Sequence, residues 1–558
     1  MIGATLKSNP ETEKFRRSPA TVMTLARMGS AHPTRLSFLR HLLRRMTGGD
    51  WRFERSVWQM DDKGVGRAVY RAIGPERTYS LVAFAHDLPP EMRSDRVIAT
   101  AWDATFTLFD GTPDAADLDR LEANVPLQEA GRISPRELSL SRANRSVRLF
   151  SHVVECLAAG QQPDIAEIDA VGYLMRTTAV YGSGKFGASD YALVADRAEL
   201  SIPFQAEMLS VWLTRQFTID IVEHMARVRG GDAAVPLDSA IKHALGVGNS
   251  TGLGMAPYLV RHPVLLNNWM MAREEALARV RAQPDATPDA VAGLKAAVQA
   301  ARENAAYWRS EHPIQIGKLS ALRNDLETVD THLSAWPMTE DHPWDALWTW
   351  GEGTLSLEGQ EALLAAMLEP HGELVDDLCS GMSANETASF AIDGTMKVGT
   401  LRRVLEDRYD WALCIDFADP ANCARFWYVS EEKLEPRLGN RNTEFGQDLE
   451  QPLCTGRLAQ ELHVALADWN EEQLVAEFLL ANPDQRYMTR RAQRCGTYPY
   501  SEVRDNLIAD TTLPIDLMRC KLAFFGASRF DPRSDKWVRI SLFQDQVYPS
   551  DLNWRVVQ

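Results

Sequence analysis

The stretch Trp51-Arg-Phe-Glu-Arg-Ser-Val-Trp58 alternates large apolar residues with polar ones, as a strand with one buried face does. Three later segments, 68–72, 78–85 and 97–109, are rich in β-branched and aromatic residues. The dipeptides Gly74-Pro75 and Pro89-Pro90 separate these segments and mark turns. The pattern predicts an antiparallel meander of three or four strands between residues 51 and 109.

The segments on either side of this meander have the period of helices. Residues 34–47 precede it, and Gly48-Gly49 ends them. After it, an apolar stripe at 147–157 and a longer one at 205–229 each predict a helix. Thr287-Pro288-Asp289 begins a further, alanine-rich helix, because a capping threonine is followed by proline in the first turn. Helices therefore dominate the chain.

The second half of the chain repeats features of the first half in the same order. Leu-Arg-Arg segments at 43–45 and 401–403 each lead to a tryptophan, Trp51 or Trp411, and then to an aromatic segment. Further residues match without a gap. Tyr173, Arg176, Gly182, Ser183 and Phe186 align with Tyr487, Arg490, Gly496, Thr497 and Tyr500. Self-similarity of this kind predicts an internal duplication.

We therefore predict an α+β fold, predominantly helical, with two small antiparallel sheets and two pseudo-symmetric halves. The predicted N-terminal half covers residues 1–255, a helical connector covers 256–330, and the C-terminal half covers 331–558. Duplicated halves tend to pack about a pseudo-two-fold axis. Because ligand sites often lie where domains meet, the sequence predicts a site between the halves.

The charge and cysteine content limit the classes of partner and compartment. The 558 residues carry 60 Lys and Arg against 76 Asp and Glu, a formal net charge of −16. An acidic surface disfavours a phosphate backbone, so no nucleic-acid partner is expected. Seven cysteines without a C-x-x-C pair indicate reduced thiols. No apolar run suits a membrane span or a signal peptide, which predicts a soluble cytoplasmic protein, with a homo-oligomer left open.

The segment Tyr181-Gly-Ser-Gly-Lys-Phe-Gly187 has the composition of an anion-binding loop. Glycines let the main chain approach a ligand closely, and successive amides can form a nest for an anion. Lys185 would add charge and Ser183 a hydroxyl, and Arg176 lies just upstream. The alternative is a tight loop whose glycines serve only the fold. The spacing fits neither a P-loop nor the helical Tyr-x-x-x-Lys pair of short-chain dehydrogenases.

The matching segment, Arg490-Arg-Ala-Gln-Arg-Cys-Gly-Thr-Tyr-Pro-Tyr500, places three arginines before a Gly-Thr turn. Guanidinium groups bind carboxylates and phosphates through paired hydrogen bonds, so Arg490 and Arg494 are candidate ligand-binding residues. The alternative is a basic helix end paired with an acidic surface. Neighbouring cations would lower the pKa of a reactive thiol at Cys495, but we interpret this residue as an inert buried cysteine.

A third candidate loop is the glycine-rich segment 246–254, which precedes an apparent helix from Ala256 to Met271. Polar groups ahead of a helix can bind an anion together with the free backbone N–H groups of its first turn. The candidates for substrate contact in this loop are Asn249, Ser250 and Thr251. The alternative is a glycine-rich break between two helices.

The same loop contains a possible nucleophile. Gly248-Asn-Ser-Thr-Gly252 has the G-x-S-x-G spacing of the hydrolase nucleophile elbow, in which Ser250 would attack the substrate. That motif needs a preceding strand, whereas residues 241–245 are predicted to be helical. A serine hydrolase is therefore kept only as a further alternative.

Metal and dinucleotide sites have little support in the sequence. The 12 histidines are dispersed without an H-E-x-x-H motif, and no G-x-G-x-x-G follows a predicted strand. No metal and no cofactor are therefore expected. One tryptophan-rich segment is interpreted as the edge of a core, with an exposed partner surface as the alternative. Its members are Trp336, Trp344, Trp348 and Trp350.

Two hypotheses of different classes follow. In the favoured one, the protein is an enzyme that acts on a small anionic metabolite, a carboxylate or a phosphate, by the acid–base chemistry of a lyase, isomerase or hydrolase. Tyr181 or Tyr498 would transfer protons, since nearby cations lower the pKa of a phenol. The anion would be bound by Arg176, Lys185, Arg490 and Arg494. In the second hypothesis, the protein is a non-catalytic binding or scaffold protein with a tryptophan-rich partner surface.

Overall fold

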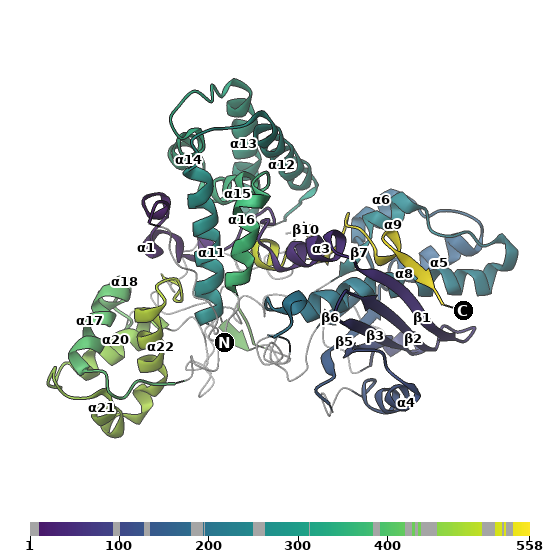
Figure 1. Cartoon of the computed structure of the whole chain (residues 1–558), viewed down its shortest axis with the longest axis horizontal. Helices are drawn as coiled ribbons and strands as arrows, with labels where there is room; N and C mark the ends of the chain where they lie inside the picture. Colours follow the sequence, from purple (N-terminus) through teal and green to yellow (C-terminus); the bar gives the residue numbers. More distant parts are fainter. Residues whose placement is uncertain are drawn as a thin grey trace. The chain divides into compact units, whose positions relative to one another are not determined.

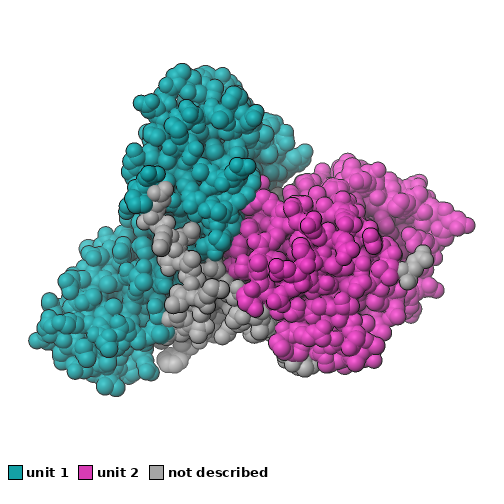
Figure 2. Space-filling model, in the orientation of Figure 1, with its two compact units in different colours: residues 1–36, 253–524, 532–537 teal, residues 37–252, 525–531, 538–558 magenta. Residues whose placement is uncertain are grey.

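The computed structural model divides the chain into two compact units (Figure 2). The helical unit comprises Met1–Leu36, Leu253–Phe524 and Pro532–Trp537, and the sheet unit comprises Ser37–Gly252, Phe525–Asp531 and Val538–Gln558. The structure describes residues 10–92, 101–127, 134–179, 194, 196–248, 263–311, 313–382, 391–418, 427–429, 434–436, 455–504, 519, 521–526, 529–531 and 539–557. The segment boundaries predicted at residues 255 and 330 stay a prediction.

The sheet unit is built on a ten-stranded mixed sheet in the order β10-β11-β7-β6-β5-β4-β3-β2-β1-β12 (Figure 1). Consecutive strands from β1 to β6 are antiparallel, while β7 pairs in parallel with β6, and β12 in parallel with β1. The strands are β1 (Arg52–Met60), β2 (Gly66–Ile73), β3 (Thr78–Ala85), β4 (Ala104–Asp110), β5 (Glu137–Arg145), β6 (Tyr173–Ala179), β7 (Gly246–Gly248), β10 (Arg529–Asp531), β11 (Arg539–Leu542) and β12 (Trp554–Val556).

The antiparallel meander predicted between residues 51 and 109 is confirmed as β1 to β4. The prediction of two small antiparallel sheets is wrong, because this meander is the middle of one large sheet. The added strands have weak sequence signals. In β5 the buried positions 139 and 141 are serines, and β7, β10 and β12 have only three residues each. Only β8 (Trp427–Val429) and β9 (Leu434–Pro436) form a separate two-stranded sheet among the described residues.

One long helix, α8 (Gln205–Gly230), packs on one face of this sheet. Its Phe217 contacts Tyr70 of β2 and Phe106 of β4 edge to face. The other face carries α4 (Ala115–Asn124), whose Leu118 and Leu121 pack with residues such as Val82 of β3. Because successive side chains of a strand point to opposite faces, the middle strands of this sheet are covered on both sides, which explains the nearly continuous apolar sequence of β3.

Shorter helices complete the sheet unit. Both α3 (Phe38–Gly48) and α5 (Phe150–Ala158) pack against α8. The helices α6 (Ile165–Val171) and α9 (Ser239–Ala244) precede β6 and β7, respectively. The predicted helices at 147–157 and 205–229 are thus confirmed as α5 and α8.

The helical unit contains α1 (Pro19–Val22), α2 (Leu25–Met28), α11 (Pro263–Arg281), α12 (Pro288–Tyr307), α13 (Pro313–Ala335), α14 (Pro343–Thr354), α15 (Leu357–Leu368) and α16 (Gly372–Val375). The predicted start of α12 is confirmed, because the Thr287 hydroxyl accepts a hydrogen bond from the Ala290 amide at 3.3 Å. Among the described helices, none combines the length and apolar content that crossing a bilayer requires.

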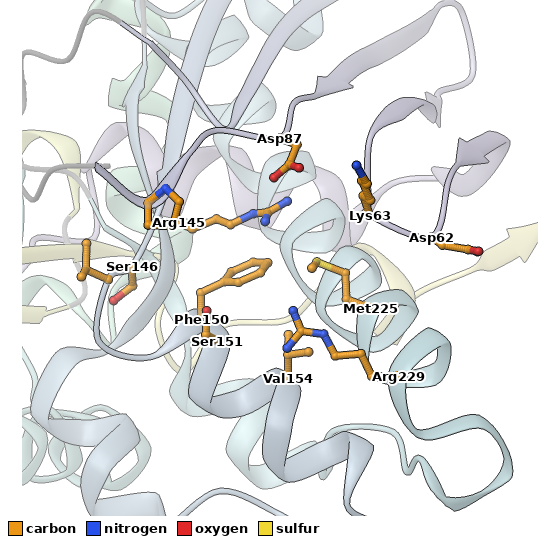
Figure 3. Close-up of a pocket in the computed structure, with 12 residues that line it drawn as sticks. Asp62, Lys63, Asp87, Arg145, Ser146, Phe150, Ser151, Val154, Met225 and Arg229 are labelled. Carbon is orange, nitrogen blue, oxygen red and sulfur yellow. The ribbon is translucent and has the colours of Figure 1, made fainter. Parts of the chain in front are cut away.

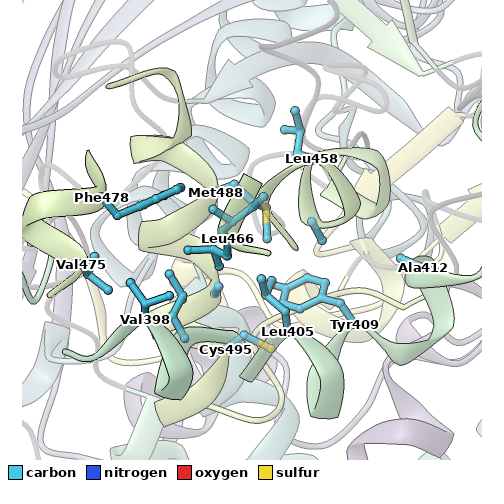
Figure 4. Close-up of a cluster of buried hydrophobic side chains, with 14 residues drawn as sticks. Val398, Leu405, Tyr409, Ala412, Leu458, Leu466, Val475, Phe478, Met488 and Cys495 are labelled. Carbon is cyan, nitrogen blue, oxygen red and sulfur yellow. The ribbon is translucent and has the colours of Figure 1, made fainter. Parts of the chain in front are cut away.

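A second group of helices in this unit has its own apolar core (Figure 4). It consists of α17 (Val398–Arg408), α18 (Asp410–Leu413), α20 (Thr455–Leu466), α21 (Val475–Ala481) and α22 (Arg486–Thr497). The core includes Leu405, Tyr409, Leu466, Phe478 and Met488, which are all buried.

The prediction of two pseudo-symmetric halves is wrong. The ungapped alignment equates β6, a strand beginning at Tyr173, with α22, a helix that contains Tyr487. The gapped alignment equates Trp51, which precedes β1, with Trp411 inside α18. Duplicated halves keep the order of their secondary structure, and these segments do not. The matched residues are therefore coincidences of composition in a long chain.

Candidate functional site

The structure describes some of the predicted site residues and leaves others outside its described residues. Tyr181, Ser183 and Lys185 lie outside the described residues, which stop at Ala179 in β6. Asn249, Ser250 and Thr251 lie outside them as well. Residues 239–244 are helical, as predicted, but the strand β7 (Gly246–Gly248) follows, so a short strand does precede the G-x-S-x-G motif. The roles assigned to these loop residues stay predictions.

Arg176 lies in the sheet unit, on β6. Its backbone is in register with Asn144 of β5 on one side and with Gly248 of β7 on the other. Its side chain is half-buried. The loop after β7 therefore begins beside the strand that carries Arg176, whereas the sequence places the two segments about seventy residues apart.

Arg490, Arg494 and Tyr498 lie in the helical unit, on or directly after α22. Arg490 is half-buried with its guanidinium 5.5 Å from the Tyr487 ring, and burial together with Arg491 and Arg494 lowers its pKa despite the opposing effect of Tyr487. Nη2 of Arg494 donates to the carbonyl oxygen of Ala391 at 2.9 Å. Arg176 belongs to the sheet unit, and the joint role predicted for it with these two arginines stays a prediction.

The remaining arginine of this segment has a structural role. Arg491 is buried and binds both carboxylate oxygens of Glu502, at 3.0 and 2.8 Å. Tyr409 donates its hydroxyl to the same carboxylate at 3.0 Å. Nearby, burial raises the pKa of the Cys495 thiol to about 12. A thiol that stays protonated at neutral pH is a poor nucleophile, so the interpretation of Cys495 as an inert buried cysteine is supported.

The tryptophan-rich segment is part of the core of the helical unit. Trp344 and Trp348 are fully buried, and Trp336 is 8% exposed. Trp350 is half-buried and stacks on His332. The interpretation as a core edge is confirmed for the three buried tryptophans.

The sheet unit contains a cavity of about 510 Å³, which the sequence did not predict (Figure 3). It lies where the turn between β1 and β2, the end of β3 and the end of β5 meet the first turn of α5 and the end of α8. It is lined by Asp62, Lys63, Asp87, Pro90, Arg145, Ser146, Val147, Phe150, Ser151, Val154, Met225 and Arg229.

Three apolar lining residues are buried beneath this cavity and form its floor, whereas Pro90 and Val147 are exposed. Val154 is fully buried, Phe150 is 2% exposed and Met225 is 6% exposed. Phe150 and Val154 come from one face of α5, and Met225 comes from α8. Helix–helix packing between α5 and α8 therefore fixes the floor.

The charged lining residues form the rim. Lys63 and Arg229 are exposed, and neither forms an ion pair with another described residue. Arg145 is held more firmly, because it lies 3.7 Å from the Asp103 carboxylate and 4.7 Å from the centre of the Phe150 ring. In Figure 3 the guanidinium groups of Arg145 and Arg229 point toward the space beside Phe150. The carboxylates of Asp62 and Asp87 lie on the same rim.

The turn that carries Lys63 is held together by hydrogen bonds. The carboxylate of Asp61 accepts hydrogen bonds from the amides of Lys63 and Val65 at 2.9 and 2.8 Å, and these bonds lower its pKa. Gly64 has a φ of +73°, and a Cβ there would lie 3.2 Å from Sδ of Met225. The turn thus packs directly on a residue of the cavity floor.

No local sequence motif predicts this cavity, because the cations that line it are spread over more than 160 residues of sequence. The available signals were the Asp-Asp-Lys-Gly segment between two predicted strands and the Arg-Gly-Gly end of a predicted helix. Among the described residues, no group of three or more His, Cys, Asp or Glu side chains is placed to hold a metal ion.

No protein family model, curated protein or solved structure matches this chain. Its function is therefore argued from its own residues and their geometry.

Proposed function

We propose that this protein binds a small organic anion in the cavity of the sheet unit. The observation that carries the proposal is the pair of cations, Lys63 and Arg229, that line one cavity without an ion-pair partner among the described residues. Both side chains are exposed at the rim and free to turn toward a ligand, and a concave cavity with convergent polar groups is a typical ligand site.

The form of the cations favours a carboxylate or a phosphate monoester. A guanidinium such as that of Arg229 presents a planar set of donors that matches two oxygens of one anion. The first turn of α5 supplies Phe150 and Ser151 to the lining, and the amino end of a helix adds positive potential.

The two rim carboxylates limit the charge of the ligand. Lys63 and Arg229 share the rim with two carboxylates, Asp62 and Asp87, while Arg145 lies 3.7 Å from the Asp103 carboxylate. Because like charges close together repel, a polyphosphate would meet more repulsion here than a monoanion. The cavity therefore suits a singly charged ligand.

The proposal concerns ligand binding and does not assign a reaction to the cavity. Ser146 and Ser151 are the hydroxyl-bearing residues of the lining, and the Ser146 hydroxyl already accepts from the Leu149 amide at 3.3 Å. The hypothesis of an acid–base enzyme depends on Tyr181, Ser250 and Tyr498, and it gains no support from this cavity.

Calorimetric titration with carboxylates and inorganic phosphate tests the proposal. Lys63→Gln and Arg229→Gln should each weaken anion binding several-fold, and the double variant should lose at least tenfold, since both remove charge from an exposed side chain without disturbing the core. Arg227→Gln is the matched control, because Arg227 is an exposed arginine on the same helix that does not line the cavity. Anion affinity that is unchanged in the double variant would contradict the proposal.

A further inference from the structure

We infer that the ligand of this cavity is an α-amino acid, whose carboxylate binds Lys63 and Arg229 and whose ammonium group binds Asp62. The inference rests on the proposed anion binding and names the class of anion. Its evidence is a third charged side chain of the rim. Asp62 lines the cavity and is exposed, and its carboxylate forms no ion pair or hydrogen bond with another described residue.

The rim therefore offers charges of both signs at one place. Asp62 and Lys63 are neighbours in the β1–β2 turn, and Figure 3 shows both side chains leaving that turn. A simple anion held by Lys63 would lie near a carboxylate that repels it. A ligand with an ammonium group next to its carboxylate replaces this repulsion by attraction, because each of its charges meets a rim charge of opposite sign.

Two other charged lining residues are engaged within the protein. Arg145 lies 3.7 Å from the Asp103 carboxylate, and Asp87 also interacts with another group of the protein. Among the described lining residues, the charges left for a ligand are two cations and one carboxylate. This set matches an α-amino acid, in which a carboxylate and an ammonium group share one carbon atom. Two carboxylate oxygens meet the two cations, and the ammonium group meets the single carboxylate.

The floor of the cavity provides no second source of affinity. Phe150, Val154 and Met225 are at most 6% exposed. Phe150 packs under the Arg145 guanidinium, and Met225 packs against Gly64. A ligand therefore meets the rim, and its charged groups determine recognition. This disfavours a fatty acid, which has one charge and an apolar chain that would find no apolar surface on the floor.

Calorimetric titration of the full chain with four matched ligands tests the inference: alanine, propionate, N-acetylalanine and alaninamide. Alanine carries both charges, propionate and N-acetylalanine carry only the carboxylate, and alaninamide carries only the ammonium group. Because an exposed ion pair contributes at most about fivefold in affinity, alanine should bind about three- to fivefold more tightly than propionate or N-acetylalanine. Alaninamide should bind most weakly, since two cations of the rim repel it.

Asp62→Asn removes the rim carboxylate and keeps the shape of its side chain. Alanine should then bind no more tightly than propionate, while propionate should bind equally well or more tightly, because a repelling charge has gone. A loss of affinity for both ligands alike would mark Asp62 as a structural part of the turn and overturn the inference. Asp232→Asn is the matched control, because Asp232 is an exposed aspartate just after α8 that does not line the cavity. This control should keep the preference for alanine.

The outcomes separate this inference from the proposed function. Propionate that binds the unmodified protein as tightly as alanine would overturn the amino acid as ligand and leave the proposed anion binding standing. A preference for alanine that survives in the Asp62→Asn protein would do the same. Alaninamide that binds as tightly as alanine, or no binding of any carboxylate, would overturn the proposed anion binding itself.

Discussion

Nε2 of His224, near the end of α8, donates a hydrogen bond of 2.9 Å to the backbone carbonyl oxygen of Asp61, at the start of the β1–β2 turn. The imidazole ring also lies edge to face with Trp58 at 5.6 Å between centroids. Asp61 in turn binds the amides of Lys63 and Val65 through its carboxylate. One histidine therefore ties the turn that carries a rim cation to the helix that carries the other.

This relationship predicts that His224 positions Lys63 without touching the ligand. His224→Ala should weaken carboxylate binding several-fold while lowering the free energy of unfolding by only about 1 kcal/mol, the usual loss for one hydrogen bond. In a Lys63→Gln background the same substitution should have little further effect on affinity, because the cation it positions is already gone. Additive losses of affinity in this double-mutant cycle would show that His224 does not act through Lys63.

A second prediction concerns the tight approach of this turn to α8. Gly64→Ala should destabilise the sheet unit by about 1–2 kcal/mol, because a left-handed φ of +73° is strained for any residue with a Cβ. The added Cβ would also lie 3.2 Å from Sδ and 3.3 Å from Cγ of Met225. Urea unfolding measures the loss.

Gly48→Ala, in the last turn of α3, is the matched control. A Cβ at this position meets nothing within 4 Å, and the residue closes a helix. Alanine is a better helix former than glycine, so this variant should be neutral or slightly more stable. Equal destabilisation by the two substitutions would mean that the backbone conformation at Gly64 has no special cost.

The strands that the sequence predicted correctly share one property. In β3, Tyr79 to Ala85 are buried almost without interruption, and β-branched and aromatic residues dominate β1 to β4. The strand β5 was not predicted because its alternation of Leu138 and Leu140 with Ser139 and Ser141 is short. That alternation indicates only one buried face, whereas Ser139 and Ser141 are buried as well and Ser139 contacts Ser210 of α8. The burial of this polar face is not visible in the sequence.

The candidate site could not be predicted for a different reason. Lys63, Arg145 and Arg229 converge only because the β1–β2 turn, the end of β5 and the end of α8 meet at one edge of the sheet unit. That convergence depends on which strand lies beside which, a long-range property that local patterns do not contain. The apparent duplication was also a property of local patterns alone. The matched residues Tyr173 and Tyr487 lie in a strand and in a helix, respectively, so matching residue types did not imply matching structure.

A third prediction concerns the buried charges of the helical unit. Arg17 binds both carboxylate oxygens of Glu274, each at 2.8 Å, and lies 2.7 Å from Glu361. All three side chains are at most 3% exposed. Arg17→Met would leave Glu274 paired with Arg273 and Glu361 paired with Arg27. It would still remove the buried charged hydrogen bonds that Arg17 donates to both glutamates, so it should cost about 3 kcal/mol. Hydrogen exchange in α11 and α15, which carry the two glutamates, reports this loss directly.

An exposed ion pair of the same unit provides the comparison. Arg302 and Asp330 lie 2.6 Å apart, but their side chains are 35% and 42% exposed. Water screens such a pair, and Arg302→Gln should change the free energy of unfolding by less than about 1 kcal/mol. If Arg17→Met were no more harmful than this control, the buried network would contribute little to stability.

The last prediction is a loss of stability in acid that originates at His371. Burial lowers the pKa of this imidazole below its usual value, although its Nδ1–H donates to the carbonyl oxygen of Met367 at 2.8 Å and favours the charged form. The ring lies edge to face with Trp344, at 4.5 Å between centroids.

Since the pKa of His371 in the folded protein lies below its pKa in the unfolded chain, the stabilising effect of the neutral ring is complete above the unfolded value of about 6.5. It is lost as the pH falls through that value toward the folded pKa, because the unfolded chain takes up the proton first. The helical unit should therefore become less stable between pH 7.5 and 5.5 through this residue. His371→Gln removes the titration, so its unfolding free energy should depend less steeply on pH over this interval. An NMR titration that finds His371 with a pKa above 6.5 would contradict the argument, and so would identical pH dependence in the two proteins.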